Sequence, residues 1–158
     1  MTGKTKVPLP LLGGCQCGAC RYEITERPLT LYVCHCTECQ RQSGSGFGMS
    51  MPVPRAGFML TRGEPAEWAR TADSGRTVNC AYCRDCGTRL FHAPARNPTA
   101  VNVKPGTLDS TGWLVPVGHL WMRSAQPWVT IPDGVVAFET QPATDFSVLF
   151  EAWRARYE

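Results

Sequence analysis

Three cysteines that lie within six residues are the first feature of this sequence that could carry chemistry. The segment CHCTECQRQSG, residues 34–44, contains Cys34, Cys36 and Cys39 and continues into a polar loop with a glycine. Thiolate sulfur is a preferred ligand of zinc, and a closed tetrahedral zinc site needs four donors. Either a fourth ligand comes from elsewhere in the chain, or one coordination position is open for a reaction.

All the cysteines of the chain fall into such clusters. The nine cysteines form three groups, which are Cys15, Cys17 and Cys20; Cys34, Cys36 and Cys39; and Cys80, Cys83 and Cys86. Donation by thiolates alone favours zinc or an iron–sulfur cluster. Two sites of four ligands would leave one thiol free, and a site of four with a site of three would leave two. The spacing does not decide between these divisions, but its C-x-C pairs disfavour a nucleic-acid-binding zinc finger.

The composition indicates one globular domain in a reducing compartment. The first residues, MTGKTKVPLPLLGG, contain an apolar stretch that two prolines interrupt, which is too short for a signal peptide or a membrane span. We therefore expect a cytoplasmic protein with no membrane partner, whose cysteines are ligands or reactive thiols. Seven thiolates and two zinc ions would change the formal net charge of +3 to zero, so the charge is no evidence for nucleic acid.

The segments that must position the cysteines have the alternation and the turn residues of short strands. The stretch 13–24 predicts a glycine turn, a ligand loop, and a strand in which Tyr22 and Ile24 alternate with polar residues. Further strands are expected within 29–36, 47–54, 57–63, 67–83, 86–94, 100–109 and 135–140, with a hairpin turn at Asp73-Ser74-Gly75. One helical turn is expected at 37–44, capped by Thr37 and ended by Gly44. The sequence thus predicts a mainly β fold of several short antiparallel strands.

The C-terminus has a helical period instead. Phe146, Leu149, Phe150 and Trp153 recur at i, i+3, i+4 and i+7, and Asp145 is a candidate cap. We expect a flexible tail over 1–10, a domain over 11–142 and an amphipathic helix over 143–158. We favour packing of the helix on the domain over a contact in a homodimer, which stays possible.

Several motifs together resemble one known family. The stretches GGCQCGACRYEI, CHCTECQRQSGSGFG, YCRDCGTRLF, KPGTLD and GHLWMRSAQPWVTIPDG are similar, in this order, to the glutathione-dependent formaldehyde-activating enzymes (GFA) and their centromere protein V (CENP-V) relatives. The resemblance covers residues 13 to 140 and implies a zinc-binding, all-β tent-like fold.

The resemblance also implies a division of the ligands between two zinc ions per chain. Cys15 and Cys17 would join Cys83 and Cys86 in a closed structural site. The second site would be a catalytic zinc with an open position, and its ligands would be Cys34, Cys36 and Cys39.

The remaining cysteines and the histidines have no assigned role in this pattern. Cys20 is expected to be a small buried residue, whereas Cys80 could complete the three-cysteine site, which would remove the open position. His35 lies between two ligands and is expected to point away from the metal. Strand packing is favoured over catalysis for His119, and nothing beyond its residue type recommends His92.

The resemblance implies a carbon–sulfur lyase that forms or cleaves adducts of a thiol such as glutathione with an aldehyde such as formaldehyde. Candidate substrate contacts follow the ligand loop, and these are Gln40, Arg41, Ser43 and Ser45. The aromatic residues that we expect in the core rather than in a ligand box are Trp113, Trp121, Trp128 and Phe138. The alternatives are a non-enzymatic zinc-stabilised binding or scaffold module and a thiol redox or metal-handling protein that uses Cys20 and Cys80.

Overall fold

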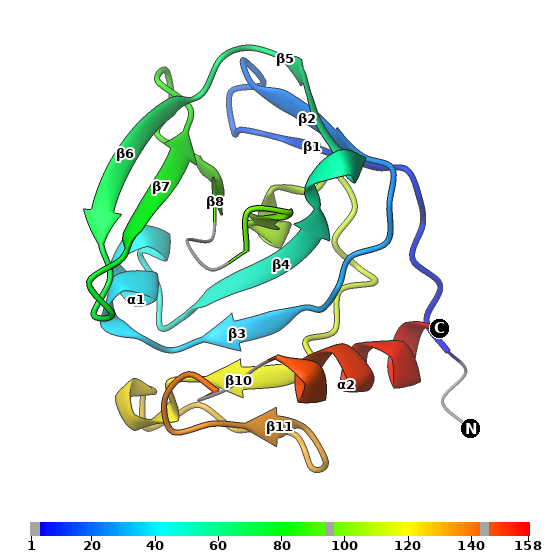
Figure 1. Ribbon diagram of the computed structural model, residues 1–158, viewed down its shortest axis with the longest axis vertical. Helices are drawn as coiled ribbons and strands as arrows, with labels where there is room; N and C mark the ends of the chain where they lie inside the picture. Colours follow the sequence, from blue (N-terminus) through cyan, green and yellow to red (C-terminus); the bar gives the residue numbers. More distant parts are fainter. Residues whose placement is uncertain (1–3, 94–96, 143–145) are drawn as a thin grey trace.

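The protein folds into two β-sheets with two short α-helices, which confirms the predicted mainly β class (Figure 1). The computed structural model describes residues 4–93, 97–142 and 146–158. The two sheets share one main hydrophobic core, to which residues from both sheets and from the C-terminal helix contribute. None of the helices in the described ranges has the length and the apolar character needed to cross a membrane.

The smaller sheet is antiparallel and has the order β1-β2-β5. Its strands are β1 (Leu11–Gly14), β2 (Arg21–Ile24) and β5 (Phe58–Arg62). Tyr22 and Ile24 are buried, as their alternation predicts. The glycine turn expected at residues 13 and 14 is wrong, because both glycines belong to β1. A Cβ atom on Gly13 would lie 2.4 Å from the Tyr22 hydroxyl oxygen, so this strand position has no room for a side chain.

The larger sheet has the order β11-β10-β3-β4-β9-β8-β7-β6. Its strands are β3 (Tyr32–Cys34), β4 (Gly48–Pro54), β6 (Ala66–Thr71), β7 (Thr77–Tyr82), β8 (Arg89–Ala93), β9 (Ala100–Val103), β10 (Gly118–Leu120) and β11 (Val136–Ala137). Its pairings are antiparallel except for those of β10, which is parallel to both β3 and β11. The sequence did not predict β10 or these parallel pairings.

The helix after the three-cysteine segment is α1 (Thr37–Ser43), and Gly44 ends it in the left-handed conformation as predicted. Its cap differs from the prediction. Cys36, rather than Thr37, is the N-cap residue, and its sulfur accepts a hydrogen bond from the Cys39 backbone N–H. Three short 3-10 turns complete the described elements, at η1 (Arg55–Gly57), η2 (Pro105–Thr107) and η3 (Met122–Ser124).

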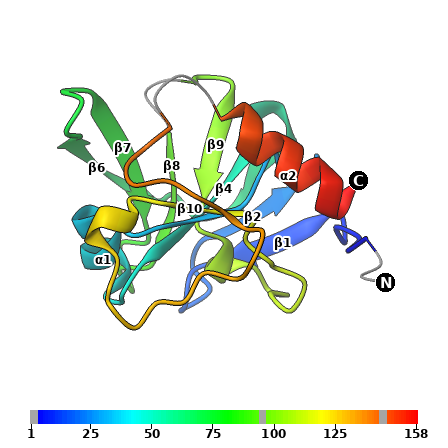
Figure 2. The same ribbon diagram turned by 90° about the horizontal axis from the view of Figure 1, so that it is seen from below.

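The C-terminal helix α2 (Ser147–Tyr157) packs on the domain, as expected. Leu149, Trp153 and Tyr157 are its buried residues, and the candidate cap Asp145 lies outside the described residues. The start of the described chain lies beside the end of α2 (Figures 1 and 2), where the Thr5 N–H donates to the Arg156 carbonyl. Val7 is buried in the core, so the predicted N-terminal tail contacts the domain at this residue.

Candidate metal centre

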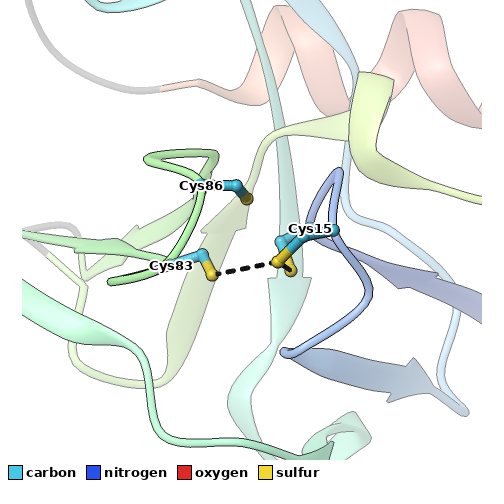
Figure 3. Close-up of side chains that lie close together, drawn as sticks. Cys15, Cys83 and Cys86 are labelled. Carbon is cyan, nitrogen blue, oxygen red and sulfur yellow. Dashed lines mark hydrogen bonds between the residues drawn. The ribbon is translucent and has the colours of Figure 1, made fainter.

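Two turns from distant parts of the chain bring four cysteine sulfurs together. Cys15, Cys17, Cys83 and Cys86 lie with all four sulfurs within 4.8 Å of one another. Figure 3 shows Cys15, on the loop after β1, facing Cys83 and Cys86, on the loop after β7. This is the first group that the family resemblance predicted, and it can hold a metal ion.

Both loops use the same local geometry to present their sulfurs. Gly18 follows one cysteine pair and Gly87 follows the other, and both have a positive φ, of 80° and 77°. The Gly18 N–H donates to the Cys15 carbonyl, and the Gly87 N–H donates to the Cys83 carbonyl. A positive φ costs glycine little, so each pair can lie on a tight turn with its two sulfurs on one side.

The sulfur spacing in this group suits a tetrahedral metal. With a zinc–sulfur distance of about 2.3 Å, tetrahedral geometry sets the sulfurs roughly 3.8 Å apart. The sulfurs of Cys15 and Cys17 are 3.6 Å apart, and those of Cys17 and Cys83 are 3.8 Å apart. A hydrogen bond with Thr88 lowers the pKa of the Cys86 thiol to about 5, which favours the thiolate form that binds metal.

The second group consists of three cysteines at the junction of β3 and α1. The sulfurs of Cys34, Cys36 and Cys39 also lie within 4.8 Å of one another, and this group can hold a metal ion too. Hydrogen bonding from Cys34 and Cys39 lowers the pKa of the Cys36 thiol, while the same pairing raises the pKa of Cys34. Thiols that share protons in this way favour one thiolate even before a cation arrives.

No fourth cysteine, histidine or carboxylate joins this second group in the part of the chain that the structure describes. Cys80 lies on β7 and is buried, outside both groups, so its completion of the three-cysteine site is not seen. Cys20 is buried as predicted, and its backbone N–H donates to the Cys15 sulfur. The two groups therefore offer four donors and three donors.

Apolar side chains cover one side of the three-cysteine group. Its members pack in a hydrophobic cluster with Tyr32, Leu120, Trp121, Phe138, Phe146 and Leu149. Trp121 has a φ of 61°, which is uncommon for a bulky residue, and the Arg123 guanidinium lies 4.8 Å from its ring centroid. Side chains of β10 and of the segment after β11 therefore pack against these cysteines.

Two buried histidines contact each other next to the three-cysteine group. His35 Nε2 and His119 Nδ1 lie 2.9 Å apart, and the two rings are stacked. Burial lowers the pKa of both imidazoles, so both are neutral near pH 7. The expectation of packing roles is consistent with this arrangement, in which the pair joins β3 to β10. His92 lies apart, with its Nε2 2.9 Å from Asn102 Nδ2.

The four candidate substrate residues lie on α1 and just after it. Gln40 donates to the His35 and Ser124 carbonyls and accepts from Gln126, so its amide joins α1 to η3. Ser43 donates to the Cys39 and Phe47 carbonyls, and Ser45 donates to the Phe47 carbonyl. The Arg41 side chain is 81% exposed and pairs with Glu38.

Gln40, Arg41 and Ser45 line an open cavity of about 390 Å³, together with Gly44, Gly46, Gln126 and Trp128. Trp128 is 67% exposed, so its predicted place in the core is wrong. Trp113, Trp121 and Phe138 are partly buried and pack against the hydrophobic clusters, as predicted. An exposed tryptophan on a cavity wall can contact a ligand with its ring.

A second cavity is lined by two cations that the sequence did not single out, Lys104 and Arg89. Lys104 follows the buried strand β9, and only 9% of its surface is exposed. The one signal in the sequence was a lysine placed directly after the apolar strand residues AVNV. A charged residue rarely follows such a run into the interior unless it has a function or a partner.

Comparisons with known proteins agree with this architecture. A profile of the family described as glutathione-dependent formaldehyde-activating enzyme matches residues 10–124. A Penicillium rubens protein that carries the same name, with provisional status, is 30% identical over 109 residues, which are 65% of this chain and 55% of that protein. The chain thus spans about half the length of this curated relative.

A crystal structure of a Rhodobacter sphaeroides protein has a similar fold. Its TM-score is 0.50 at 21% sequence identity, and the match covers 63% of this chain and 88% of that protein. This likeness concerns the fold alone. The profile match spans most of the sequence and both cysteine groups, and on this ground the chain belongs to the family of glutathione-dependent formaldehyde-activating enzymes.

Proposed function

We propose that the protein is a zinc-dependent carbon–sulfur lyase-type enzyme that forms or cleaves thiol–aldehyde adducts. Glutathione and formaldehyde are the proposed substrates, and S-(hydroxymethyl)glutathione is their adduct. One observation carries the proposal: two groups of cysteines stand in the same chain, and one offers four donors while the other offers three. A three-ligand zinc site keeps a coordination position for a substrate, as catalytic zinc sites do.

The residues present fit two zinc ions per chain. Cys15, Cys17, Cys83 and Cys86 would hold a structural zinc, because their four sulfurs have nearly tetrahedral separations. Cys34, Cys36 and Cys39 would hold the catalytic zinc. Bound there, zinc would lower the pKa of a substrate thiol and favour its thiolate.

The reaction itself needs few groups from the protein. A thiolate sulfur forms a bond to the aldehyde carbon, the carbonyl π electrons move to oxygen, and that oxygen takes up a proton. The reverse reaction breaks the carbon–sulfur bond and returns the proton. The apolar cluster around Cys34, with Trp121 and Phe138, would limit water at the reacting atoms.

The residues of α1 are proposed to contact the thiol substrate. Arg41 has an exposed guanidinium that can reach a ligand in the adjoining cavity, and Ser45 lies on the same wall. Gln40 and Ser43 use their polar atoms within the protein, so they would shape the site through the backbone they hold. The partners are small molecules, and a reducing compartment such as the cytoplasm suits the free thiolates.

The test is zinc content and turnover of the wild type and of Cys36→Ser. We expect two zinc ions per chain in the wild type and one in the variant, with an unchanged far-ultraviolet circular dichroism spectrum. Exchange NMR with glutathione and formaldehyde should show adduct formation accelerated by the wild type only. Two zinc ions without any acceleration would refute the enzyme and favour a zinc-stabilised binding module, of the kind expected for centromere protein V relatives.

A further inference from the structure

A second cavity lies between the two cysteine groups. It has a volume of about 510 Å³, which is in the usual range for small-molecule sites. One wall is next to the four-cysteine group and includes Gln16, Cys86 and Thr88. The opposite wall belongs to α1 and β4 and includes Ser43 and Gly48. The cavity therefore includes one member of the four-cysteine group, Cys86, and residues of α1, the helix that carries Cys39.

Gly48 brings the cavity close to the three-cysteine group. It pairs with Cys34 across β3 and β4. A Cβ atom at Gly48 would lie 2.8 Å from Gln42 Nε2 and 3.2 Å from Cys39 Cβ, so the Gly48 backbone packs closely against the ligand loop. The apolar cluster with Trp121 and Phe138 packs against the same cysteines. A ligand in the cavity would thus lie close to the segment that carries the three-cysteine group.

Two cations line this cavity, and among the described residues neither forms an ion pair with an aspartate or a glutamate. Lys104 is 9% exposed, and the side-chain ion pairs that the described part of the chain forms are Arg21–Asp109 and Arg41–Glu38. Arg89 has a buried Nε atom without a hydrogen-bond partner. The described lining residues include no aspartate or glutamate. Buried cations are costly unless they are paired, so this cavity is complementary to an anion.

The charge of Lys104 also responds to the cysteines. Burial lowers its pKa, and the nearby Cys39, Cys80 and Cys34 act in the opposite direction. Lys104 is therefore electrostatically coupled to the three-cysteine group as well as facing the cavity.

We propose that this cavity binds a carboxylate of the thiol substrate, and that Lys104 and Arg89 are the specificity-determining contacts. The inference rests on the proposed function and extends it: the substrate class is an acidic thiol, held by its carboxylate while its sulfur reaches the three-cysteine group. Arg89 can offer a planar pair of donors to a carboxylate, and Lys104 offers a compact charge. Arg41 would contact another part of the same substrate from the neighbouring cavity.

The test is isothermal titration calorimetry of the zinc-loaded full-length protein with glutathione and with its diethyl ester. The ester keeps the thiol and the peptide framework but masks both carboxylates, each with an ethyl group. Charge-assisted hydrogen bonds contribute about 1.5–3 kcal/mol, so we expect the wild type to prefer glutathione by roughly 10- to 100-fold. Lys104→Met and Arg89→Met should each remove most of this preference by weakening glutathione binding alone.

A matched control is Arg76→Met, because Arg76 is an exposed cation close to the turn between β6 and β7 and far from the cavity lining. This variant should keep the full preference. Lys104→Met removes a buried charge without a counterion, so its melting temperature should equal or exceed that of the wild type. Should Lys104→Met fail to fold, Arg89→Met and the wild-type preference still decide.

The outcomes separate this inference from the proposed function. A wild type that binds both thiols equally, or methionine variants that retain the preference, would overturn the carboxylate site and leave the enzyme intact. Loss of the preference in Arg41→Ala instead of Lys104→Met would place the carboxylate in the other cavity and would also overturn it. A wild type that binds neither thiol would refute the proposed function and this inference with it.

Discussion

The two cysteine groups use one kind of donor in two different topologies. The four-cysteine group joins loops that are far apart in sequence, since Cys17 and Cys83 are 66 positions apart. The three-cysteine group lies within a single β3–α1 junction, from Cys34 to Cys39. A metal in the first group would close a long loop, whereas a metal in the second would link residues that are already close in sequence. The difference fits the roles proposed above, in folding for the first group and in chemistry for the second.

The surroundings of the two cysteine groups also differ. Around the first group, the tight turns at Gly18 and Gly87 fix the sulfurs from both sides. Around the second, the sulfurs lie between an apolar cluster and a cavity that carries Lys104. A full set of four sulfurs suits a structural metal, and a set of three sulfurs near a cation suits the proposed anionic substrate.

The largest expected effect follows from removing a ligand of the four-cysteine group. Cys83→Ser should abolish folding at 25 °C, because the zinc-binding free energy that couples to folding is of the order of 10 kcal/mol. Domain stability is typically about 5–15 kcal/mol, so this loss is large enough to unfold the chain. Circular dichroism and zinc analysis should show a disordered chain that holds little metal.

The corresponding change in the three-cysteine group is Cys36→Ser, which should give a folded protein with one zinc ion. Cys80→Ala serves as the control for the loss of a buried cysteine, since Cys80 belongs to neither group. It should keep both zinc ions. Equal destabilisation by Cys83→Ser and Cys36→Ser would remove the distinction between a structural site and a catalytic site.

Removal of the metal should distinguish the two groups without a mutation, because the three-cysteine group should lose its zinc before the four-cysteine group does. A chelator reaches an open three-ligand site more readily than a closed four-ligand site, so zinc should leave in two kinetic phases. We expect the first phase to remove one zinc and the activity, while circular dichroism stays constant. The second phase should coincide with unfolding. A single phase in which metal, activity and structure vanish together would contradict the comparison.

Much of the fold was predictable where the local pattern and the tertiary contacts agree. Tyr22 and Ile24 alternate in sequence and are buried in the structure, and Gly44 ends α1 as expected. Strand β10 escaped prediction because Gly118 is a poor strand residue by itself. In the structure a Cβ atom at Gly118 would lie 2.2 Å from Leu149 Cδ2, so packing against α2 requires a glycine at this place.

The candidate site, like the fold, could be predicted from the sequence only in part. The spacing of the cysteines marked all three clusters, but only the family resemblance divided the ligands between two metal ions, since spacing cannot show which distant loops meet. Trp128 was misplaced in the core because aromatic residue type does not show which side of a loop faces solvent. Lys104 was missed because its environment depends on α1 and β4, which lie far from it in sequence.

A smaller effect is expected from Gln40→Leu, which tests how the three-cysteine group is held. The Gln40 amide donates to the His35 and Ser124 carbonyls, so its loss should loosen the ligand loop. Outer contacts of this kind usually change metal affinity by about 10- to 100-fold. Competition with a fluorescent zinc chelator should show weaker binding of one zinc only. Unchanged affinity for both would mean that the loop is positioned by its backbone alone.

Thr88→Val is the corresponding change at the four-cysteine group and should have a smaller effect. It removes the hydroxyl that lies 3.2 Å from the Cys86 sulfur and that accepts from the Gln16 N–H. The Cys86 thiol should then regain part of its ordinary pKa, and zinc binding should weaken most at low pH. Four sulfurs remain, so we expect less than a tenfold loss of affinity at pH 7.5. A loss of zinc affinity larger than that caused by Gln40→Leu would contradict the prediction that the four-cysteine group depends less on its surrounding contacts than the three-cysteine group does.

The smallest expected effect concerns the ion pair between Arg21 and Asp109, which supports the β2 side of the four-cysteine group. The hydrogen bond from Arg21 lowers the pKa of Asp109, so the pair stabilises the fold above the unfolded carboxyl pKa of about 3.9 and loses this effect as the pH falls through the lower folded value. The Asp109 side chain is 50% exposed, so Asp109→Asn should lower the free energy of unfolding at pH 7 by only about 0.5 kcal/mol. Urea titration at pH 7 measures this. A loss of several kcal/mol would mean that this ion pair contributes to stability on the scale expected for the zinc ligands, and the contrast between the two groups would lose its energetic basis.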